Sequence, residues 1–544
     1  MKGIAGFIDF SKTLNKENSL EIITTMFNTL KYPYPRREYT APAITINHHY
    51  AFAGDSGCLT EPNNSLLLYR DPIGLQPLFY TMIGNRLVFA SAIRALLAHP
   101  GAEARLDAAG LAELFAIGPA RYEHSGIFKD IHALPPGHIL KAEDHHGTVC
   151  ITLTRYWDFP SRIHGDSEEA TIVRVRELLA EAVLKRIPPE RMESTCALLS
   201  GGVDSSVVTA LAAEAYRQAG KRLTTFSFDF KNSADHFKSN AFQPDRDRPW
   251  VDKMAAFCQT RHEYLECGPE DLANALYPAV DARDLPGMAD VDASLLHFCR
   301  KIPQEITTAL TGECADEIFG GYPWFHSIPE GSPAQPHTKS FPWSQDFTAR
   351  TAFLKDEWIA SLKLEDTAAV FCQKNNFPGS HSRQVGYLTL KWFMPALLER
   401  MHCMGGYSGL EAAVPFADVK LMQYVWRIPW DMKSKNSSVK YILREAARGI
   451  VPEDVLNRKK SPFPKTYDPA YTSILAERLH DVLSDSNAPV SAVVDAEKAR
   501  RFTEAMLKDP NISRPWFGQL MAGPQMMAYI LQLDYWLRKY KVRF

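Results

Sequence analysis

The residues with the clearest chemical potential are those at positions 200–206, which read Ser-Gly-Gly-Val-Asp-Ser-Ser. A short apolar run at 196–199 precedes them and a helix-like run at 207–216 follows, which indicates a strand, a tight turn and the start of a helix. Backbone N–H groups and the positive end of a helix converge at such a junction, and glycine lets a phosphate approach the backbone. We therefore predict a loop that binds nucleotide phosphates, against the alternative of an ordinary strand-to-helix turn. Its predicted contacts are Leu199, Ser200, Gly201, Gly202, Asp204, Ser205 and Ser206.

The acidic residue in this loop predicts a metal ion. The Asp204 carboxylate would repel a phosphate unless Mg²⁺ lay between them. Asp316 also follows an apolar, strand-like run, at 307–310. The carboxyl ends of parallel strands share one edge of a sheet, where α/β proteins bind ligands. We therefore predict that Asp204 and Asp316 share Mg²⁺.

Two kinds of pattern follow each other along the chain and predict an α/β protein with two domains. Up to about residue 158, short alternating or β-branched runs are broken by turn residues, which favours an antiparallel, β-rich domain. From residue 195 onward, apolar strand-like runs alternate with helical stretches, which is typical of a parallel sheet. The first set of runs is 43–46, 65–69, 86–89 and 138–140, and the second is 196–199, 223–228 and 307–310.

The boundary between the two domains is predicted near residue 160. Residues 159–166 contain proline, glycine and mixed charge, as a linker does, and Ser167 then starts a capped amphipathic helix. We therefore assign 1–160 and 161–544 to the two domains. After residue 351 the pattern is mostly helical, most clearly at 387–401 and 439–448, and the proline-rich segment 327–342 is predicted to be a surface loop.

Composition limits the class of protein. The chain has 544 residues, of which 45% are hydrophobic, and its net charge is −2. This charge balance gives no support to nucleic-acid binding, which usually requires a basic excess. The nine cysteines are odd in number and form no CxxC pair, which suits a reducing compartment. No apolar run reaches the roughly 18 residues of a membrane span. We expect a soluble, cytoplasmic protein that binds neither nucleic acid nor membrane.

The motifs resemble those of a known enzyme family. The segment 200–206 resembles the loop of the ATP-pyrophosphatase superfamily and lacks the Gly-Lys-Ser/Thr of a Walker loop. Residues 311–322 (TGECADEIFGGY), 457–462 (NRKKSP) and 410–418 (LEAAVPFAD) resemble signatures of the asparagine synthetases, in the same order. The resemblance covers residues from about 195 to 465.

This resemblance implies a reaction and a set of roles. The family splits ATP between the α- and β-phosphates with Mg²⁺ and activates a carboxylate as an acyl-AMP. It implies that Lys460 stands beside the polyphosphate and then stabilises the oxyanion, and that Glu313 helps to deprotonate the attacking nitrogen. A solvated basic face is the alternative for Lys460. The resemblance also assigns Glu411 to the catalytic residues, and Gly312, Ser227 and Phe228 to the residues that bind ATP. For Phe228, a purely structural role in the core is almost as well supported.

The acceptor substrate is predicted to lie near the loop 284–292. On residue type alone, Asp290 and Asp292 could instead be helix caps. The family's Glu-x-Arg becomes Glu411-Ala412-Ala413, and its Arg-x-Asp becomes Arg400-Met401-His402. We assign His402 to the substrate set. The paired loss of an arginine and an aspartate indicates a lost ion pair or a reshaped pocket, and favours a substrate other than aspartate.

The N-terminal domain resembles a class II glutamine amidotransferase through residues 1–7, 70–80, 89–91 and 134–137. In that family a Cys at position two attacks glutamine, but Lys2 stands here, and a protonated lysine has no thiol. The Arg-Gly-Pro-Asp and Asn-Gly-Glu-Ile-Tyr-Asn strings are also absent. We predict a truncated, degenerate sandwich without glutaminase activity.

Together these patterns predict an ATP-dependent ligase that joins a small-molecule or peptide carboxylate to an amine or to free ammonia. Two alternatives remain: an ammonia-dependent asparagine synthetase, and a nucleotide-binding pseudoenzyme scaffold. The pseudoenzyme is disfavoured because Asp204, Glu313, Asp316 and Lys460 are all present. Homodimer formation is left open.

Overall fold

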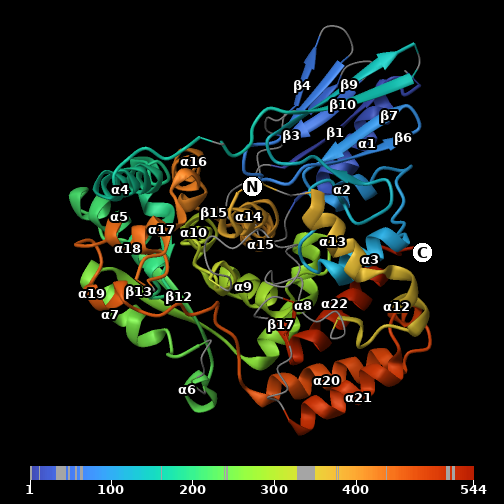
Figure 1. The fold of residues 1–544 in the computed structure, drawn as a ribbon. Coiled ribbons are helices and arrows are strands. Elements are labelled where there is room, and N and C mark those ends of the chain that lie inside the picture. The colour runs from blue at the N-terminus through green and yellow to red at the C-terminus, as the bar shows by residue number, and fades with distance from the viewer. Residues whose placement is uncertain are drawn as a thin grey trace.

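The computed structural model shows two packed antiparallel sheets followed by a parallel sheet and a large set of helices (Figure 1). The sheets of the N-terminal part lie at the top of that view, and the helices α20, α21 and α22 lie at the bottom. The structure describes residues 3–11, 13–31, 44–46, 50–54, 58–61, 65–146, 148–160, 162–237, 239, 243–326, 350–374, 377, 379–436, 438–509, 515–517 and 521–544. The segment 327–342, predicted as a surface loop, lies outside these residues.

The N-terminal part is a sandwich of two sheets, in the strand orders β2-β3-β1-β7-β6-β8 and β10-β9-β5-β4. In β1, Ile4 and Ile8 pack into the core between the sheets, whereas Ala5 and Phe7 face the side that α1 covers. This alternation follows the two-residue period of a strand. The predicted strands are confirmed within the described residues, and both sheets are present although the N-terminal segment is short. The elements are β1 (Ile4–Asp9), α1 (Lys16–Thr29), β2 (Ile44–Ile46), β3 (Tyr50–Gly54), β4 (Cys58–Glu61), β5 (Ser65–Tyr69), β6 (Phe79–Ile83), β7 (Arg86–Ala90), α2 (Ile93–Leu97), α3 (Ala108–Ala116), β8 (His132–Ala133), β9 (His138–His145) and β10 (Thr148–Arg155).

The second part is built on a parallel sheet in the order β13-β12-β11-β14-β15. Its central strands β11 and β14 are neighbours, so the segments that follow them, which carry Asp204 and Asp316, start side by side. The Ser167 side chain caps α4 as predicted, because it accepts from the Ala170 N–H at 3.2 Å. The elements up to the end of this sheet's fourth strand are α4 (Glu168–Leu184), η1 (Pro189–Ser194), β11 (Thr195–Leu198), α5 (Val203–Gln218), β12 (Thr224–Phe230), α6 (Ser233–His236), α7 (Arg248–Cys258), β13 (Arg261–Cys267), α8 (Pro269–Arg283), α9 (Asp290–Lys301) and β14 (Thr308–Leu310).

The rest of the chain is mostly helical, as predicted. The run predicted at 387–401 belongs to a longer stretch from α14 through a π-helical segment, η4, to α15. The run predicted at 439–448 forms helix only from Tyr441, because Lys440 takes a left-handed conformation (φ +58°) before it. The elements are α10 (Ala315–Phe319), η2 (Pro323–Phe325), α12 (Asp356–Leu362), α13 (Leu364–Lys374), α14 (His381–Leu388), η4 (Thr389–Phe393), α15 (Met394–Tyr407), β15 (Glu411–Ala413), η5 (Pro415–Ala417), α16 (Val419–Arg427), α17 (Trp430–Lys433), α18 (Tyr441–Ala446), α19 (Glu453–Leu456), α20 (Pro469–Ser484), η6 (Pro489–Ala492), α21 (Ala496–Lys508), β16 (Pro515–Phe517), β17 (Met521–Ala522) and α22 (Pro524–Lys539).

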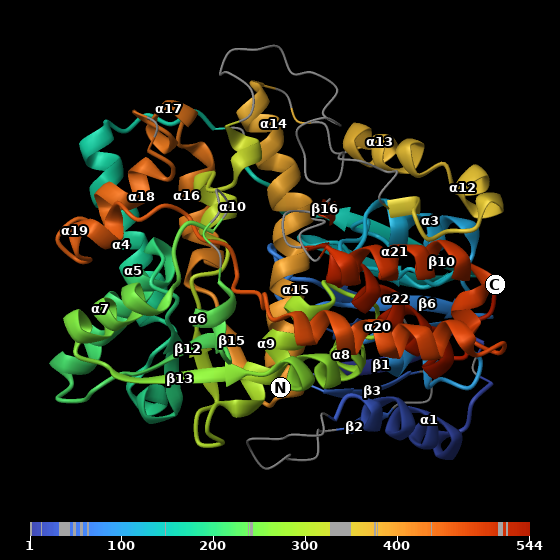
Figure 2. The same ribbon diagram turned by 90° about the horizontal axis from the view of Figure 1, so that it is seen from below.

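The two parts pack against each other through buried contacts. The Arg94 guanidinium donates to Asp284 at 2.9 Å, Arg121 pairs with Glu399, and the Tyr529 hydroxyl donates to the Leu114 carbonyl at 3.1 Å. One hydrophobic cluster also runs through both parts. Figure 2 shows the parallel sheet and the helices α4, α5 and α7 on one side, and α8, α20 and α22 on the other, with α9 and α15 between them.

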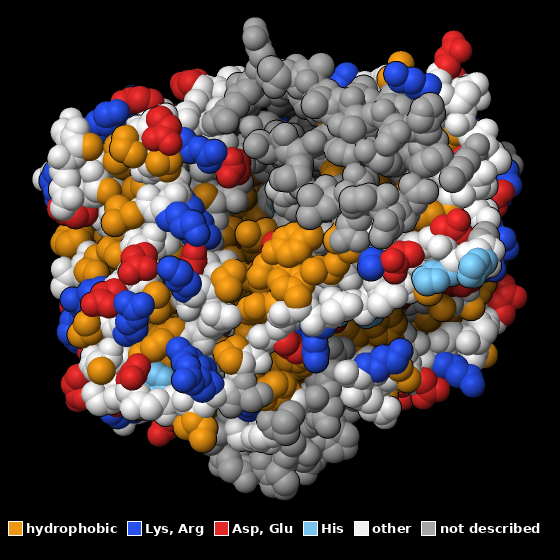
Figure 3. Space-filling model, turned by 90° about the horizontal axis from the view of Figure 1, so that it is seen from above, with side chains coloured by type: hydrophobic (Ala, Val, Ile, Leu, Met, Phe, Trp, Pro, Cys, Tyr) orange, Lys and Arg blue, Asp and Glu red, His pale blue; other side chains and the backbone are white. Residues whose placement is uncertain are grey.

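On the face drawn in Figure 3, acidic and basic side chains are interspersed and form no large patch of one charge. Hydrophobic side chains gather near the centre of this face. Among the described residues, every helix is too short or too polar to cross a lipid bilayer.

Candidate active site

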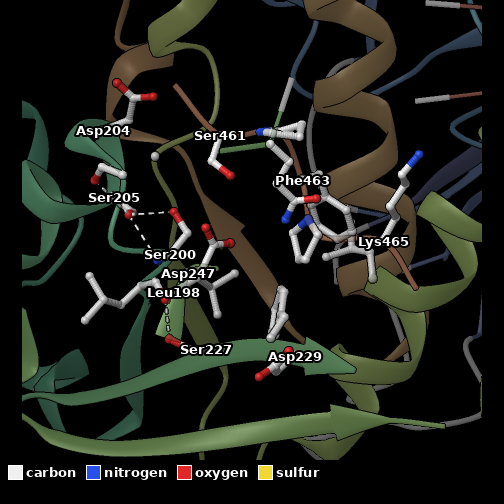
Figure 4. A pocket seen from close by; sticks show the side chains of 18 of the residues that line it. Leu198, Ser200, Asp204, Ser205, Ser227, Asp229, Asp247, Ser461, Phe463 and Lys465 are labelled. Carbon is white, nitrogen blue, oxygen red and sulfur yellow. Dashed lines mark hydrogen bonds between the residues drawn. The ribbon is translucent and has the colours of Figure 1, made fainter. Parts of the chain in front are cut away.

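The segment 200–206 forms a turn between β11 and α5, as predicted. Gly201 has φ +69°, and a Cβ there would lie 2.6 Å from the Trp250 Cβ, so glycine is required. The Ser205 hydroxyl accepts from the Ser200 N–H at 3.1 Å and lies 3.0 Å from the Ser200 hydroxyl (Figure 4). Gly312, after β14, comes so close that a Cβ there would lie 2.6 Å from the Ser205 N. The turn is therefore held rigidly open at the carboxyl edge of the sheet.

Two acidic and two basic side chains meet beside this turn. The Lys440 ammonium lies 2.6 Å from an Asp204 oxygen and 2.5 Å from an Asp316 oxygen. The Lys460 ammonium pairs with the other oxygen of Asp316. The structure thus brings together three residues that the sequence analysis singled out, and adds Lys440, which it did not.

Burial and charge act on these carboxyl groups in opposite directions. Burial raises the pKa of Asp204, and the Lys440 ammonium only partly offsets this effect. Burial also acts to raise the pKa of Asp316, but Lys440 and Lys460 outweigh it and lower that pKa to about 2. At neutral pH the site therefore keeps at least one firmly ionised carboxylate in contact with both lysines.

This arrangement fits a Mg²⁺ ion shared with ATP. Mg²⁺ prefers oxygen ligands and is usually bound through one or two carboxylates together with substrate phosphates and water. Asp204 and Asp316 supply two such carboxylates from facing elements. Among the described ranges, no group of three or more His, Cys, Asp or Glu side chains could hold a metal without such help.

The cavity beside the turn extends past the sheet edge to a second group of charged residues. The Arg400 guanidinium donates to Glu313 at 2.8 Å, and Arg400 itself lies over the Phe463 ring at 5.2 Å. Glu317, four residues after Glu313, accepts from the Tyr322 hydroxyl at 2.5 Å, and burial raises its pKa to about 8. Glu313 and Lys460 both line this cavity of about 260 Å³, so the predicted catalytic pair lines the same cavity as Asp204 and Asp316.

Ser227 and Phe228, which the sequence analysis assigned to the ATP set, also line this cavity. The Ser227 hydroxyl donates to the Leu199 carbonyl, and Phe228 stacks on Phe298 at 4.4 Å with an interplanar angle of 6°. Arg458 donates to the Ser200 carbonyl at 3.1 Å and pairs with Asp247 at 2.5 Å, so it fastens the C-terminal segment to the loop. Figure 4 shows Ser205 and Ser227 on one side of the cavity and Phe463 and Lys465 on the other.

Asp290 and Asp292 lie next to this cavity but are not on its surface. Asp292 accepts from the Met288 N–H at 2.9 Å and lies 3.3 Å from Arg283, so it holds the loop before α9. Asp290 accepts from the Gln525 amide at 2.8 Å, and burial raises its pKa to about 6. Neither residue is the cap of α9, because the cap position is Ala289 and has no side-chain cap hydrogen bond; both lie in the first turn of the helix and make structural contacts.

Two predicted site residues lie elsewhere. Glu411 begins β15 at the opposite edge of the sheet, where its side chain is 58% exposed and lies 3.4 Å from Arg191. His402 lies in a separate cavity between the two parts of the chain, near Gly3 and Ser91. A sequence motif cannot show which end of a strand a residue occupies, and a helical residue can point to either of two neighbouring cavities. We therefore leave Glu411 and His402 out of the site.

The sequence analysis missed three basic residues of the site, Lys440, Arg400 and Arg458. Each is buried and its charge is paired with a carboxylate. Arg458 belongs to the same motif as Lys460, which was a usable signal. The sequence around Lys440 predicts only a helix. The position of Lys440 depends on its left-handed backbone conformation before α18, which the sequence pattern does not predict.

A glycine turn at the edge of a parallel sheet, with facing carboxylates and lysines, is an arrangement suited to nucleotide-dependent ligation. The asparagine synthase family matches residues 174–538, and the glutamine amidotransferase domain matches residues 47–157. The chain is 40% identical to asparagine synthetase [glutamine-hydrolyzing] 3 of Bacillus subtilis, over 91% of this chain and 80% of that protein. The chain belongs to the asparagine synthase family, and it is an ATP-dependent ligase.

More distant relatives show how far the similarity extends. Asparagine synthetase [glutamine-hydrolyzing] 1 of Bacillus subtilis is 27% identical, over 74% of this chain and 66% of that protein. Amidase chry2 of Gibberella zeae is 26% identical, over 80% of this chain and 72% of that protein. Proteins named as an asparagine synthetase and as an amidase are thus both similar to this chain over most of its length.

Proposed function

We propose that this ligase activates a carboxylate as an acyl-AMP, releases pyrophosphate and passes the acyl group to an amine or to free ammonia, without hydrolysing glutamine. The observation that carries the proposal is the convergence of the 200–206 turn, the Asp204–Lys440–Asp316–Lys460 cluster and the Glu313–Arg400 pair around one cavity.

In the first half-reaction a substrate carboxylate oxygen attacks the α-phosphorus of ATP, and the bond to the β,γ-pyrophosphate breaks. Negative charge then accumulates on the leaving pyrophosphate. Lys440, Lys460 and the backbone at the start of α5 are preorganised to stabilise that charge. Asp204 and Asp316 would hold Mg²⁺, which neutralises polyphosphate charge when bound.

In the second half-reaction a nitrogen nucleophile attacks the acyl carbon, and AMP leaves. The nucleophile must lose a proton, and the Glu313 carboxylate, held by Arg400, is the group placed to accept it. Lys460, which lines the same cavity, stabilises the oxyanion that forms at the acyl carbon.

Independence from glutamine rests on Lys2. A glutaminase of the resembled class needs a thiol at that position, whereas this sequence has an amine and also lacks the strings that hold glutamine there. The relatives from Bacillus subtilis are named glutamine-hydrolyzing. On this proposal the chain differs from them in its nitrogen source.

An ammonia-dependent asparagine synthetase is the second candidate, favoured by the name of the 40% identical relative. Against it, Ala413 supplies no charge where the resembled family has the arginine of Glu-x-Arg. The wall next to the Glu313–Arg400 pair is formed by Phe393, Leu397 and Phe463, which suits a substrate with less charge than aspartate.

One experiment separates these candidates. Pyrophosphate release is measured with a panel of carboxylic acids, including aspartate, each with ammonium, glutamine or an organic amine, and the Asp204→Ala variant is the background control. The proposal expects release that depends on a carboxylate other than aspartate and is unaffected by glutamine. Release with aspartate and ammonium alone would establish the second candidate, and turnover that requires glutamine would contradict both.

A further inference from the structure

A second cavity lies on the other side of the short helix α10 from the ATP site. α10 contributes Asp316 to the first cavity and Ile318 to the second, while Glu317 touches both. The second cavity has a volume of about 360 Å³, within the range of small-molecule sites. Neither half of the proposed reaction uses it.

Its polar lining is rich in basic side chains. The basic residues are Arg162, His164, Arg383, Arg427 and Lys433, from the linker and from α14, α16 and α17. Glu317 is the single acidic residue among the described ones that line it. Its carboxyl group accepts a hydrogen bond from the Tyr322 hydroxyl at 2.5 Å. Basic side chains therefore outnumber acidic ones in the described lining of this cavity.

Lys433 is the central case. Lys433 is only 9% exposed, and its ammonium donates to the Ile318 carbonyl at 3.1 Å. Within the described ranges, no carboxylate oxygen lies within ion-pairing distance of that ammonium. Burial and the nearby Arg383 lower the pKa of Lys433 to about 7. A buried cation without a counter-ion is costly, so an anion beside Lys433 would be strongly favoured.

The apolar lining is aromatic and arranged to receive a ring. The Arg383 guanidinium lies over the Trp426 ring at 4.0 Å, which holds that cation at the cavity wall. Trp430 stacks on Phe325 at 5.6 Å with an interplanar angle of 14°, and both rings line the cavity. An aromatic ligand could extend this stack while its charged group reached Lys433 and Arg383.

We propose that the cavity lined by Lys433, Arg383, Trp426 and Trp430 is a second ligand site, which takes a small organic anion carrying an aromatic ring. The site is separate from the ATP cavity, and its ligand need not be a reactant. The inference does not depend on which carboxylate the enzyme activates.

Phenyl phosphate is the probe, titrated into the full chain by calorimetry in the presence of a saturating non-hydrolysable ATP analogue. We expect one binding event, with weaker binding for inorganic phosphate and for phenol, because each lacks one of the two recognised features. Lys433→Met should weaken binding about tenfold or more, as expected for loss of a buried charge contact. Lys435→Met is the matched control, because Lys435 lies two residues on and pairs with Glu168 outside the cavity.

Arg383→Gln is the second variant, which keeps the test decisive if Lys433→Met does not fold. The proposal is overturned if phenyl phosphate fails to bind at millimolar concentration, or if the ATP analogue displaces it, which would place it in the nucleotide site. Equal affinity in folded Lys433→Met, Arg383→Gln and Lys435→Met would overturn it as well.

Discussion

The Arg400 guanidinium donates to Glu313 at 2.8 Å, and the Arg400 side chain is only 3% exposed. The pair joins α15 to the segment after β14, two elements far apart in sequence. It fixes the position of the Glu313 carboxylate, which lines the same cavity as Asp204 and Asp316.

The first prediction tests the role of Glu313. Glu313→Gln keeps the size of the side chain but removes its basicity, so amide formation should fall roughly 10²–10⁴-fold, the usual cost of losing a general base. The first burst of pyrophosphate should survive, and acyl-AMP should accumulate. Rapid-quench measurements of pyrophosphate and of amide product check this. Loss of the burst itself would place Glu313 in the phosphate site.

The second prediction concerns the proposed Mg²⁺ carboxylates. Asp204→Ala and Asp316→Ala should each abolish pyrophosphate release that depends on substrate, because each removes an anionic ligand and leaves Lys440 with one carboxylate. Exchange of labelled pyrophosphate into ATP is the measurement. Asp454→Ala, which changes a half-exposed carboxylate paired with Lys253, is the control and should leave exchange intact.

The third prediction concerns Lys440, which the structure adds to the site. Lys440→Met should slow pyrophosphate release by roughly 10²–10³-fold, comparable with the loss of one preorganised charge-stabilising donor. The variant should also require less Mg²⁺ for half-maximal rate, because Asp204 and Asp316 then lack their shared counter-charge and attract the cation more strongly. Steady-state rates over a Mg²⁺ titration test this, with Lys435→Met as the control. An unchanged rate would limit Lys440 to a structural role.

The fourth prediction concerns nitrogen supply. Glutamine should neither be hydrolysed nor support product formation, while ammonium or an organic amine should. A coupled glutamate assay measures hydrolysis directly. The control is an Asp204→Ala sample kept without ATP. Glutamate release that exceeds this control and rises with enzyme concentration would contradict the proposal. Such release would indicate a nucleophile other than a thiol at position two.

The fifth prediction links Asp290 to stability. Its pKa in the folded protein is about 6, above the ordinary value of 3.8, because of burial. A raised folded pKa stabilises the fold below the unfolded pKa, and this contribution is lost as pH rises through about 6. Asp290→Asn removes the titration, so its stability relative to the natural protein should improve by roughly 2–3 kcal/mol between pH 4 and pH 7.

Unfolding midpoints of the two proteins, measured at several pH values across that window, check the fifth prediction. Asparagine can keep the contact with Gln525, whose Oε1 is buried without a partner and can accept from the new amide. A stability difference that does not change with pH would mean that Asp290 titrates as it does in an unfolded chain.

The local chemistry of the phosphate site was readable in the sequence because it is short-range. The strand, the turn and the helix around residues 200–206 are determined by neighbouring residues: an apolar run, two glycines and a helix start. The same holds for the Ser167 cap and for the alternating strands of the N-terminal sandwich. Hydrophobic residues that recur every two or every 3.6 residues indicate which face of a strand or helix is buried, and this information is sufficient to predict a fold class.

The partners of each charge could only be decided by the tertiary structure, because ion pairs form between segments that the sequence does not place side by side. Lys440 reaches Asp204 across 236 positions of the chain, and Arg400 reaches Glu313 across 87. The sequence motifs also assigned Glu411 and His402 to the site. In the structure Glu411 lies at the start of its strand, paired with Arg191, and His402 lines a separate cavity. The sequence by itself determined the family, the fold class and the position of the turn between β11 and α5 that we predict to bind ATP. Packing decided which buried charges neutralise one another, since that depends on distances in space that no spacing along the chain records.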